Sequence, residues 1–138
     1  MPVIVRAVHL LAACAVVAAC EASTAAPDSN LKAGPWAGPH VTMMVTSERT
    51  TLEFDCGQAS VDGTIPLDRD NAFSVTGTFV QERPGPTTPS GPPRRPMRLT
   101  GSIKDDTMSM RVTLTDQNED LGSFTLAFGA DAHLVKCK

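Results

Sequence analysis

From residue 40 to the C-terminus, apolar and polar side chains alternate along the chain with a period of two. Such alternation predicts strands with one buried and one solvated face, as in antiparallel sheets. The runs cover residues 40–46, 50–56, 58–65, 72–80, 97–104, 107–115, 122–129 and, less clearly, 132–137. The side chains expected to face inward are Val41, Met43, Val45, Leu52, Phe54, Ala59, Val61, Ile65, Phe73, Val75, Phe79, Met97, Leu99, Ile103, Met108, Met110, Val112, Leu114, Phe124, Leu126 and Phe128.

Short turn-forming segments separate these runs, so sequential strands are expected to pair as neighbours. We therefore expect an all-β fold, an antiparallel up-and-down meander of about eight strands that forms a closed or nearly closed small barrel. Gly63, Gly77 and Gly101 recur on the inward side, where glycine lets a sheet curl, although Thr-Gly pairs are common in β proteins generally. The five Phe residues and the five Met residues beyond the expected signal peptide favour a filled interior over a small ligand cavity.

The first 19 residues have the pattern of an export signal. Arg6 precedes an apolar stretch, residues 7–19, that is too short to span a bilayer. The residues VAAC at 17–20 resemble the lipobox of bacterial lipoproteins, which implies that Cys20 is lipidated. Cys14 fits the same pattern with a shorter apolar stretch before it, and a signal peptide cleaved within residues 19–26 is a further alternative.

Lipidation at Cys20 implies attachment to a membrane, because two or more acyl chains are sufficient for a stable anchor. Glu21 follows the cysteine, and by the sorting pattern of lipoproteins in double-membraned bacteria this resembles delivery to the outer membrane, facing the periplasm. Residues 20–33 are then the lipidated cysteine and a flexible tether, and residues 34–138 are a single β-barrel domain.

Two cysteines, Cys56 and Cys137, remain after the signal and lipidation cysteines are set aside. Export places them in an oxidising compartment, so we expect one disulfide that closes the end of the barrel beside Trp36 and His40. Two free thiols, or a metal site completed by His40 and His133, are the alternatives, but the CxxC and HxxxH spacings of common zinc sites are missing. We predict no metal and no cofactor.

Residues 81–96 read QERPGPTTPSGPPRRP, and their six prolines predict an extended loop without helix or strand. Arg83, Arg94 and Arg95 make this loop basic on a protein of net charge −3. The loop is therefore either a recognition element for an anionic partner or an insertion whose charges are solvated.

Motifs for a chemical reaction are absent, including G-x-S-x-G, HExxH, the P-loop and the Rossmann glycines. The oxygen-rich residues 116–120 have the spacing of half a calcium loop, but Leu121 stands where such a loop needs glycine. Glu53 and Asp55 share a strand face and could act as acid and base, although strand exteriors carry such pairs routinely. The lack of a basic excess argues against nucleic acid as a partner.

Two resemblances extend this interpretation. Gly34-Pro35-Trp36 resembles the G-x-W motif of lipocalins and related calycin barrels, which implies that Trp36 plugs a barrel end beside a basic residue, Lys136 or Lys138. Residues 34–41, 53–56, 77–86, 107–114 and 136–137 together resemble small, uncharacterised bacterial secreted proteins and lipoproteins. That second resemblance implies an address and a fold but no activity.

We therefore expect a lipid-anchored β-barrel of the cell envelope that is a non-enzymatic binding or structural module. Trp36, His40, Arg83, Arg94 and Arg95 are its candidate contact residues, and its partners are the membrane and either an envelope protein or a small apolar ligand. A calycin-like carrier of an apolar ligand, an inhibitor of an exported protease, and a hydrolase using Glu53, Asp55 or His40 are the alternatives.

Overall fold

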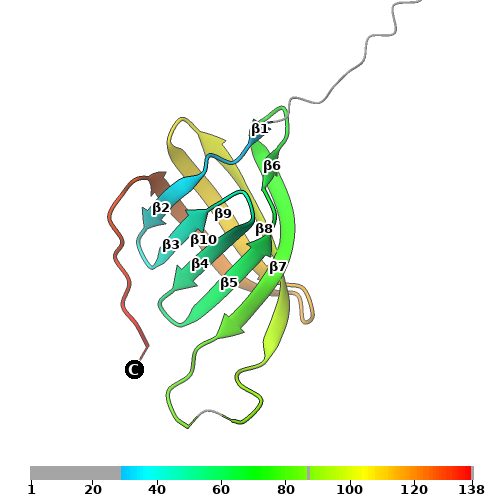
Figure 1. Cartoon of the computed structure of the whole chain (residues 1–138), viewed down its shortest axis with the longest axis vertical. Helices are drawn as coiled ribbons and strands as arrows, with labels where there is room; N and C mark the ends of the chain where they lie inside the picture. The colour runs from blue at the N-terminus through cyan, green and yellow to red at the C-terminus, as the bar shows by residue number, and fades with distance from the viewer. Residues whose placement is uncertain (1–28, 87, 138) are drawn as a thin grey trace, which may run out of the picture.

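The computed structural model describes residues 29–86 and 88–137, and these form ten strands and no helix. Eight of the strands build a closed antiparallel barrel in the order β10-β2-β3-β4-β5-β7-β8-β9, and β1 pairs with β6 in a small separate sheet (Figure 1). The strands are β1 (Ser29–Asn30), β2 (Gly34–Gly38), β3 (Val41–Val45), β4 (Arg49–Phe54), β5 (Gly57–Asp62), β6 (Pro66–Leu67), β7 (Ala72–Gln81), β8 (Arg94–Lys104), β9 (Thr107–Leu114) and β10 (Glu119–Phe128). None of the described segments is a helix with the length and hydropathy of a membrane span.

The predicted all-β meander and closed barrel are confirmed, and the alternating side chains form one core. Met43, Leu99 and Met108 are part of this buried core, with exposed fractions of 2, 0 and 0%. Each buried aliphatic or Met side chain contributes about 1.5–3 kcal/mol of gross burial free energy. These buried side chains therefore fill the interior of the barrel, as the sequence favours.

The last strand of the barrel differs from the expectation. The sequence predicts a strand over residues 132–137, but these residues form no strand, and β2 occupies the eighth place between β10 and β3. Proline interrupts strand pairing, so the sequence gives little indication of β2. Pro35 lies within β2 and Pro39 follows it, and both are compatible with a strand that pairs fully only with β3. Residues 129–137, which we call the strap, instead run back along the outside of the barrel (Figure 1).

The sequence predicts a flexible tether over residues 20–33, but the folded domain begins before residue 34. β1 pairs with β6, and the Leu31 side chain is 4% exposed, so residues 29–33 belong to the folded domain. The expected signal peptide, Cys20, the alternative Cys14 and residues 20–28 lie outside the described residues.

The long loop is shorter than residues 81–96, the range that the sequence predicts. β7 runs to Gln81 and β8 begins at Arg94, so the loop between them is residues 82–93, which we call the Pro-rich loop.

Two of the glycines expected to face inward have different surroundings. An added Cβ at Gly77 would meet the Ser60 carbonyl oxygen, so this glycine permits close approach of two strands. Gly63, by contrast, lies in a turn with a φ of 78° and open space around it.

Antiparallel order places the turns of the barrel at two ends. One end carries the β2–β3, β4–β5 and β9–β10 turns together with the Pro-rich loop, and we call it the mouth end. The opposite end carries the β3–β4 and β8–β9 turns and the β1–β6 sheet. Figure 1 shows β1 and the Pro-rich loop at opposite extremes of the molecule.

Candidate functional site

An apolar hollow of about 260 Å³ opens at the mouth end of the barrel. Phe54 lies between Phe79 and Phe124, with ring centroids 6.1 and 5.2 Å away. Leu114 and Leu121 complete the apolar wall. We call these five residues the mouth; Phe124 and Leu121 are only half-buried, so apolar surface faces the hollow.

A histidine–carboxylate pair forms one side of the mouth. His40 Nδ1 lies 2.6 Å from Asp55 Oδ2, and both residues line the hollow. His40 occupies the β2–β3 turn with a left-handed backbone (φ 67°), which is uncommon for a residue with a side chain. The Val135 N–H donates to Asp55 Oδ1 at 2.7 Å, and this bond, followed by the contact with His40, lowers the pKa of Asp55.

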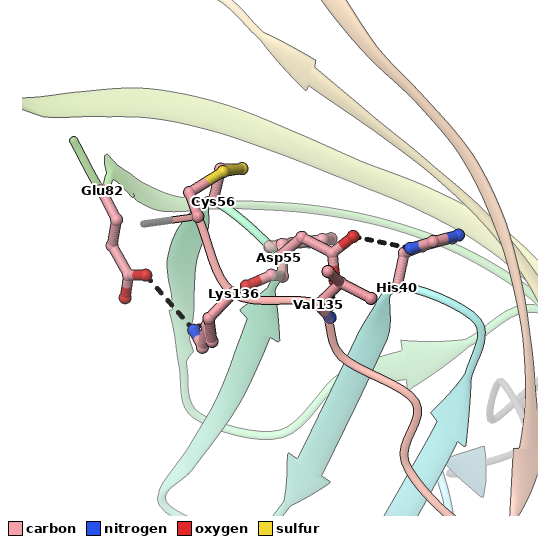
Figure 2. The surroundings of a disulfide bond; sticks show 8 residues. His40, Asp55, Cys56, Glu82, Val135 and Lys136 are labelled. Atoms are coloured by element: carbon pink, nitrogen blue, oxygen red, sulfur yellow. Dashed lines mark hydrogen bonds and ion pairs between the residues drawn. A yellow bond between two sulfur atoms is a disulfide. The ribbon is translucent and has the colours of Figure 1, made fainter. Parts of the chain in front are cut away.

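The disulfide lies directly beside this pair. Cys56 and Cys137 are bonded, with Cα atoms 5.2 Å apart, so the predicted pairing is seen in the structure. The strap reaches Cys56 by crossing the β2–β3 turn, where the His40 N–H donates to the His133 carbonyl at 3.0 Å. The Cys137 N–H then donates to the Asp55 carbonyl at 3.0 Å. Figure 2 shows Cys56 beside the pair of Asp55 and His40.

Lys136 fastens the end of the strap to the outer wall. Its Nζ lies 2.8 Å from Glu53 Oε1 and 3.3 Å from Glu82 Oε2 (Figure 2), and it donates to the Phe54 carbonyl at 3.1 Å. These contacts, with Glu53 first, raise the pKa of Lys136. The Glu53 carboxylate is therefore held outside the barrel, and only His40 and Asp55 of the proposed acid–base group converge.

The three arginines expected to meet an anionic partner have different surroundings. Arg95 makes a bidentate contact with Asp116 at 2.9 Å and a further hydrogen bond to Glu119 at 2.8 Å. These bonds lower the pKa of Asp116, and they occupy the Arg95 guanidinium with carboxylates of the β9–β10 turn. Arg83 and Arg94 are exposed at the base of the Pro-rich loop.

The ion pairs of Arg95 also involve the residues considered as a calcium site, 116–120. Two of the oxygen donors that the sequence offers in residues 116–120 are the Asp116 and Glu119 carboxylates, which face Arg95. Within the described part of the chain, no group of three His, Cys, Asp or Glu side chains is placed to hold a metal ion.

Trp36 lies away from the mouth, which corrects its expected role as a contact residue. Its side chain is 1% exposed, and its Nε1 donates to the Lys32 carbonyl at 3.1 Å. Phe128 packs edge-on against it with ring centroids 5.2 Å apart, and Lys32 Nζ lies 3.7 Å from the centre of the Phe128 ring. A basic residue does stand near the tryptophan, but it is Lys32, whereas Lys136 lies at the mouth end and Lys138 lies outside the described residues.

Sequence reasoning missed a β-bulge at Leu121, one of the residues that line the mouth hollow. The pairing register between β9 and β10 shifts between Asp120 and Gly122, which marks a β-bulge at Leu121. An added Cβ at Gly122 would have nothing within 4 Å, and its φ is 114°. Gly122, at the start of the alternating run 122–129, was the available signal, since a glycine in a strand pattern often marks a bulge.

Two other hollows flank the mouth. One of about 500 Å³ lies within the Pro-rich loop and shares Gln81 with the mouth hollow. The other, of about 420 Å³, lies on the outer wall between the strap and β2–β5, beside the exposed Met44 side chain. The lining of the mouth hollow comes from β4, β7, β9 and β10, and of these three hollows it is the one that includes three phenylalanine rings.

Comparisons of the chain with protein-family models, with curated proteins and with solved structures find no match.

Proposed function

We propose that this protein is an exported, lipid-anchored binding module of the cell envelope, whose mouth holds an apolar ligand or an apolar side chain of an envelope protein. The observation that carries the proposal is the group of three phenylalanine rings around an open hollow of about 260 Å³. Binding sites in proteins are typically concave and apolar, with a few polar groups at the rim that fix orientation. His40 and Asp55 are such groups here.

The filled core supports a site at the mouth rather than a calycin-like cavity in the centre. Met43, Leu99 and Met108 belong to one buried core cluster and are exposed by 2% or less. A ligand that entered the centre would displace well-packed side chains, which costs several kcal/mol. An apolar ligand at the mouth would instead cover Phe124 and Leu121, which are only half-buried.

A binding role suits the mouth better than hydrolysis. His40 and Asp55 form a pair that can accept a proton, but among the described residues no hydroxyl or free thiol lines the same hollow for them to activate. Cys56, which also lines it, is bonded to Cys137. The mouth therefore offers apolar area and orientation but no nucleophile of its own.

The two ends of the barrel fit an anchored module. The described chain begins with β1 at the end opposite the mouth (Figure 1). A lipid on Cys20 would hold that opposite end toward the membrane, and the mouth would face the periplasm.

The proposed binding site is tested with the neutral apolar fluorophore N-phenyl-1-naphthylamine, titrated against the oxidised chain. We expect saturable fluorescence enhancement that Leu121→Glu weakens at least tenfold, because the new carboxylate would enter the hollow. Met44→Glu, which changes the outer wall, is the matched control and should leave the affinity unchanged. Equal affinities for all three chains, or no enhancement, would overturn the site, and circular dichroism establishes that each variant is folded.

The proposed anchor is tested separately by mass spectrometry of the membrane fraction. We expect the mature chain to begin at a diacylated Cys20, and Cys20→Ser to release the protein from the membrane. An unmodified Cys20 in membrane-bound protein would contradict the anchor and leave the mouth to be judged by the fluorophore.

A further inference from the structure

β10 closes the barrel with only a small part of its length. It pairs with β9 from Glu119 to Ala127, but it pairs with β2 only through Ala127 and Phe128. From Glu119 to Phe124, the edge of β10 that faces β2 has no strand partner among the described residues, and at Thr125 the Gly38 backbone of β2 lies against the carbonyl oxygen. This free edge begins at the bulge of the mouth.

Two prolines explain why the pairing stops. The Gly129 N–H donates to the Pro35 carbonyl at 2.8 Å, so residue 35 of β2 faces β10. Successive residues of a strand face opposite sides, so Ala37 and Pro39 face β10 as well. Proline has no N–H to donate, and Pro39 forms a bridge with His133 of the strap instead, so the ladder between β2 and β10 ends at Ala37.

The same alternation identifies the free backbone groups of β10. The Phe128 N–H donates to the Asp106 carbonyl on the β9 side, and pairing with β9 continues through Leu126 and Phe124. The N–H and carbonyl groups of Ser123, and the N–H of Thr125, therefore point to the open side. An unpaired row of this kind is a template for another extended strand.

The corner of the barrel between β5 and β7 shows how this fold fills such a gap. β5 pairs with β7 only through residues 57–60, which leaves the first half of β7 without a partner on that side. Extended segments of the chain itself cover that corner, where the Leu31 N–H donates to the Ile65 carbonyl at 2.8 Å. The Leu31 and Ile65 side chains are 4 and 0% exposed, so apolar side chains from extended chain fill the space.

We propose that an extended segment of a partner protein fills the corresponding gap at the mouth. It adds as a strand to the free edge of β10 and places one large apolar side chain among Phe54, Phe79 and Phe124. This inference rests on the proposed function and names the class of ligand. Strand addition of this type takes its affinity from main-chain hydrogen bonds and its specificity from pockets for alternate side chains.

The charges at the rim support an apolar side chain in the mouth. Asp55 is paired with His40, and Asp116 and Glu119 are paired with Arg95. A charged side chain entering the mouth would find these groups already occupied and would lose its hydration. The segment is therefore extended, apolar at the position that enters the mouth, and free of proline where it pairs.

The experiment selects binders to the oxidised chain from a displayed library of randomised nonapeptides. We expect selected peptides to carry a large apolar residue at one fixed position and to compete with N-phenyl-1-naphthylamine. Methylation of the peptide nitrogens on the pairing side should weaken binding at least tenfold. Ser123→Pro, which removes an N–H from the free edge, should weaken peptide binding at least tenfold and leave fluorophore binding unchanged, whereas Ser123→Ala should bind both normally.

The outcomes separate this inference from the proposed function. If the fluorophore binds at the mouth but no peptide is selected, or if peptides bind Ser123→Pro as well as the parent, strand addition is wrong and the binding mouth stands. If neither probe binds, both proposals fall. If the chain sediments as a dimer that Ser123→Pro converts to a monomer, the occupant is a second copy of this chain and the inference of a partner segment is overturned.

Discussion

The disulfide between Cys56 and Cys137 offers the sharpest test of how the strap is held. The two cysteines are 81 residues apart in the sequence. Closing a loop of that length removes about 4.5 kcal/mol of conformational entropy from the unfolded chain in the loop-closure model. The variant Cys56→Ser/Cys137→Ser should therefore lose up to about 4.5 kcal/mol of unfolding free energy. Serine is close in size to cysteine, so the substitution removes the covalent link with little change in packing.

Urea unfolding of the parent and of the double-serine variant measures this loss. Trp36, the one tryptophan in the chain, is buried at the opposite end and reports unfolding of the whole barrel by its fluorescence. The midpoint of thermal unfolding should fall by roughly 15–20 °C, at about 4 °C per kcal/mol for a domain of this size. A control chain that carries Cys56→Ser and ends at residue 129 removes the strap as well, so the extra loss measures its hydrogen bonds and ion pairs.

A loss below about 1 kcal/mol in the double-serine variant would refute the reasoning. It would mean that the unfolded chain is already constrained, or that the strap is held by its other contacts alone. An equal loss in the double-serine and shortened chains would show that those other contacts contribute nothing without the covalent link.

Three further predictions concern single residues. The Val135 N–H is the main cause that lowers the pKa of Asp55 from 3.8, so the stability that Asp55 contributes is present above that pH and is lost as the pH falls through the folded-state pKa. Asp55→Asn should therefore flatten the pH dependence of urea stability between about pH 4 and pH 2, and an unchanged acid slope would contradict this assignment. Gly77→Ala should cost about 1–3 kcal/mol by urea unfolding, because the Cβ would meet the Ser60 carbonyl oxygen, and a neutral effect would show that the strands are further apart. Trp36→Ala should cost about 3–5 kcal/mol by circular dichroism in urea, and a loss below 2 kcal/mol would contradict its place in the core.

Most of the barrel could be predicted from the alternation of side chains. The runs from Val41 to Leu114 follow a strict period of two, and the side expected to face inward is the side that is buried. The prediction was wrong where the alternation was weak or interrupted. Residues 132–137 read as a strand because Leu134 and Val135 are apolar, but backbone bonds to the β2–β3 and β4–β5 turns replace strand pairing there.

The site could be predicted only in part, for a physical reason. A cysteine pair and a nearby His40 follow from composition and from the expected export. The meeting of Phe54, Phe79 and Phe124 depends on the register of non-adjacent strands, which alternation does not specify. Trp36 was assigned to the mouth because β2 was not recognised as a strand, and that strand carries the residue toward the opposite end.

The free edge of β10 is the claim on which the account of binding depends most, and amide hydrogen exchange tests it directly. We expect the Ser123 and Thr125 amides of the oxidised chain to exchange at least a hundredfold faster than those of Phe124 and Leu126, which pair with β9. This alternation along one strand would establish an unpaired edge beside the mouth. Equal protection of all four amides would mean that another segment already covers β10, and it would contradict the account.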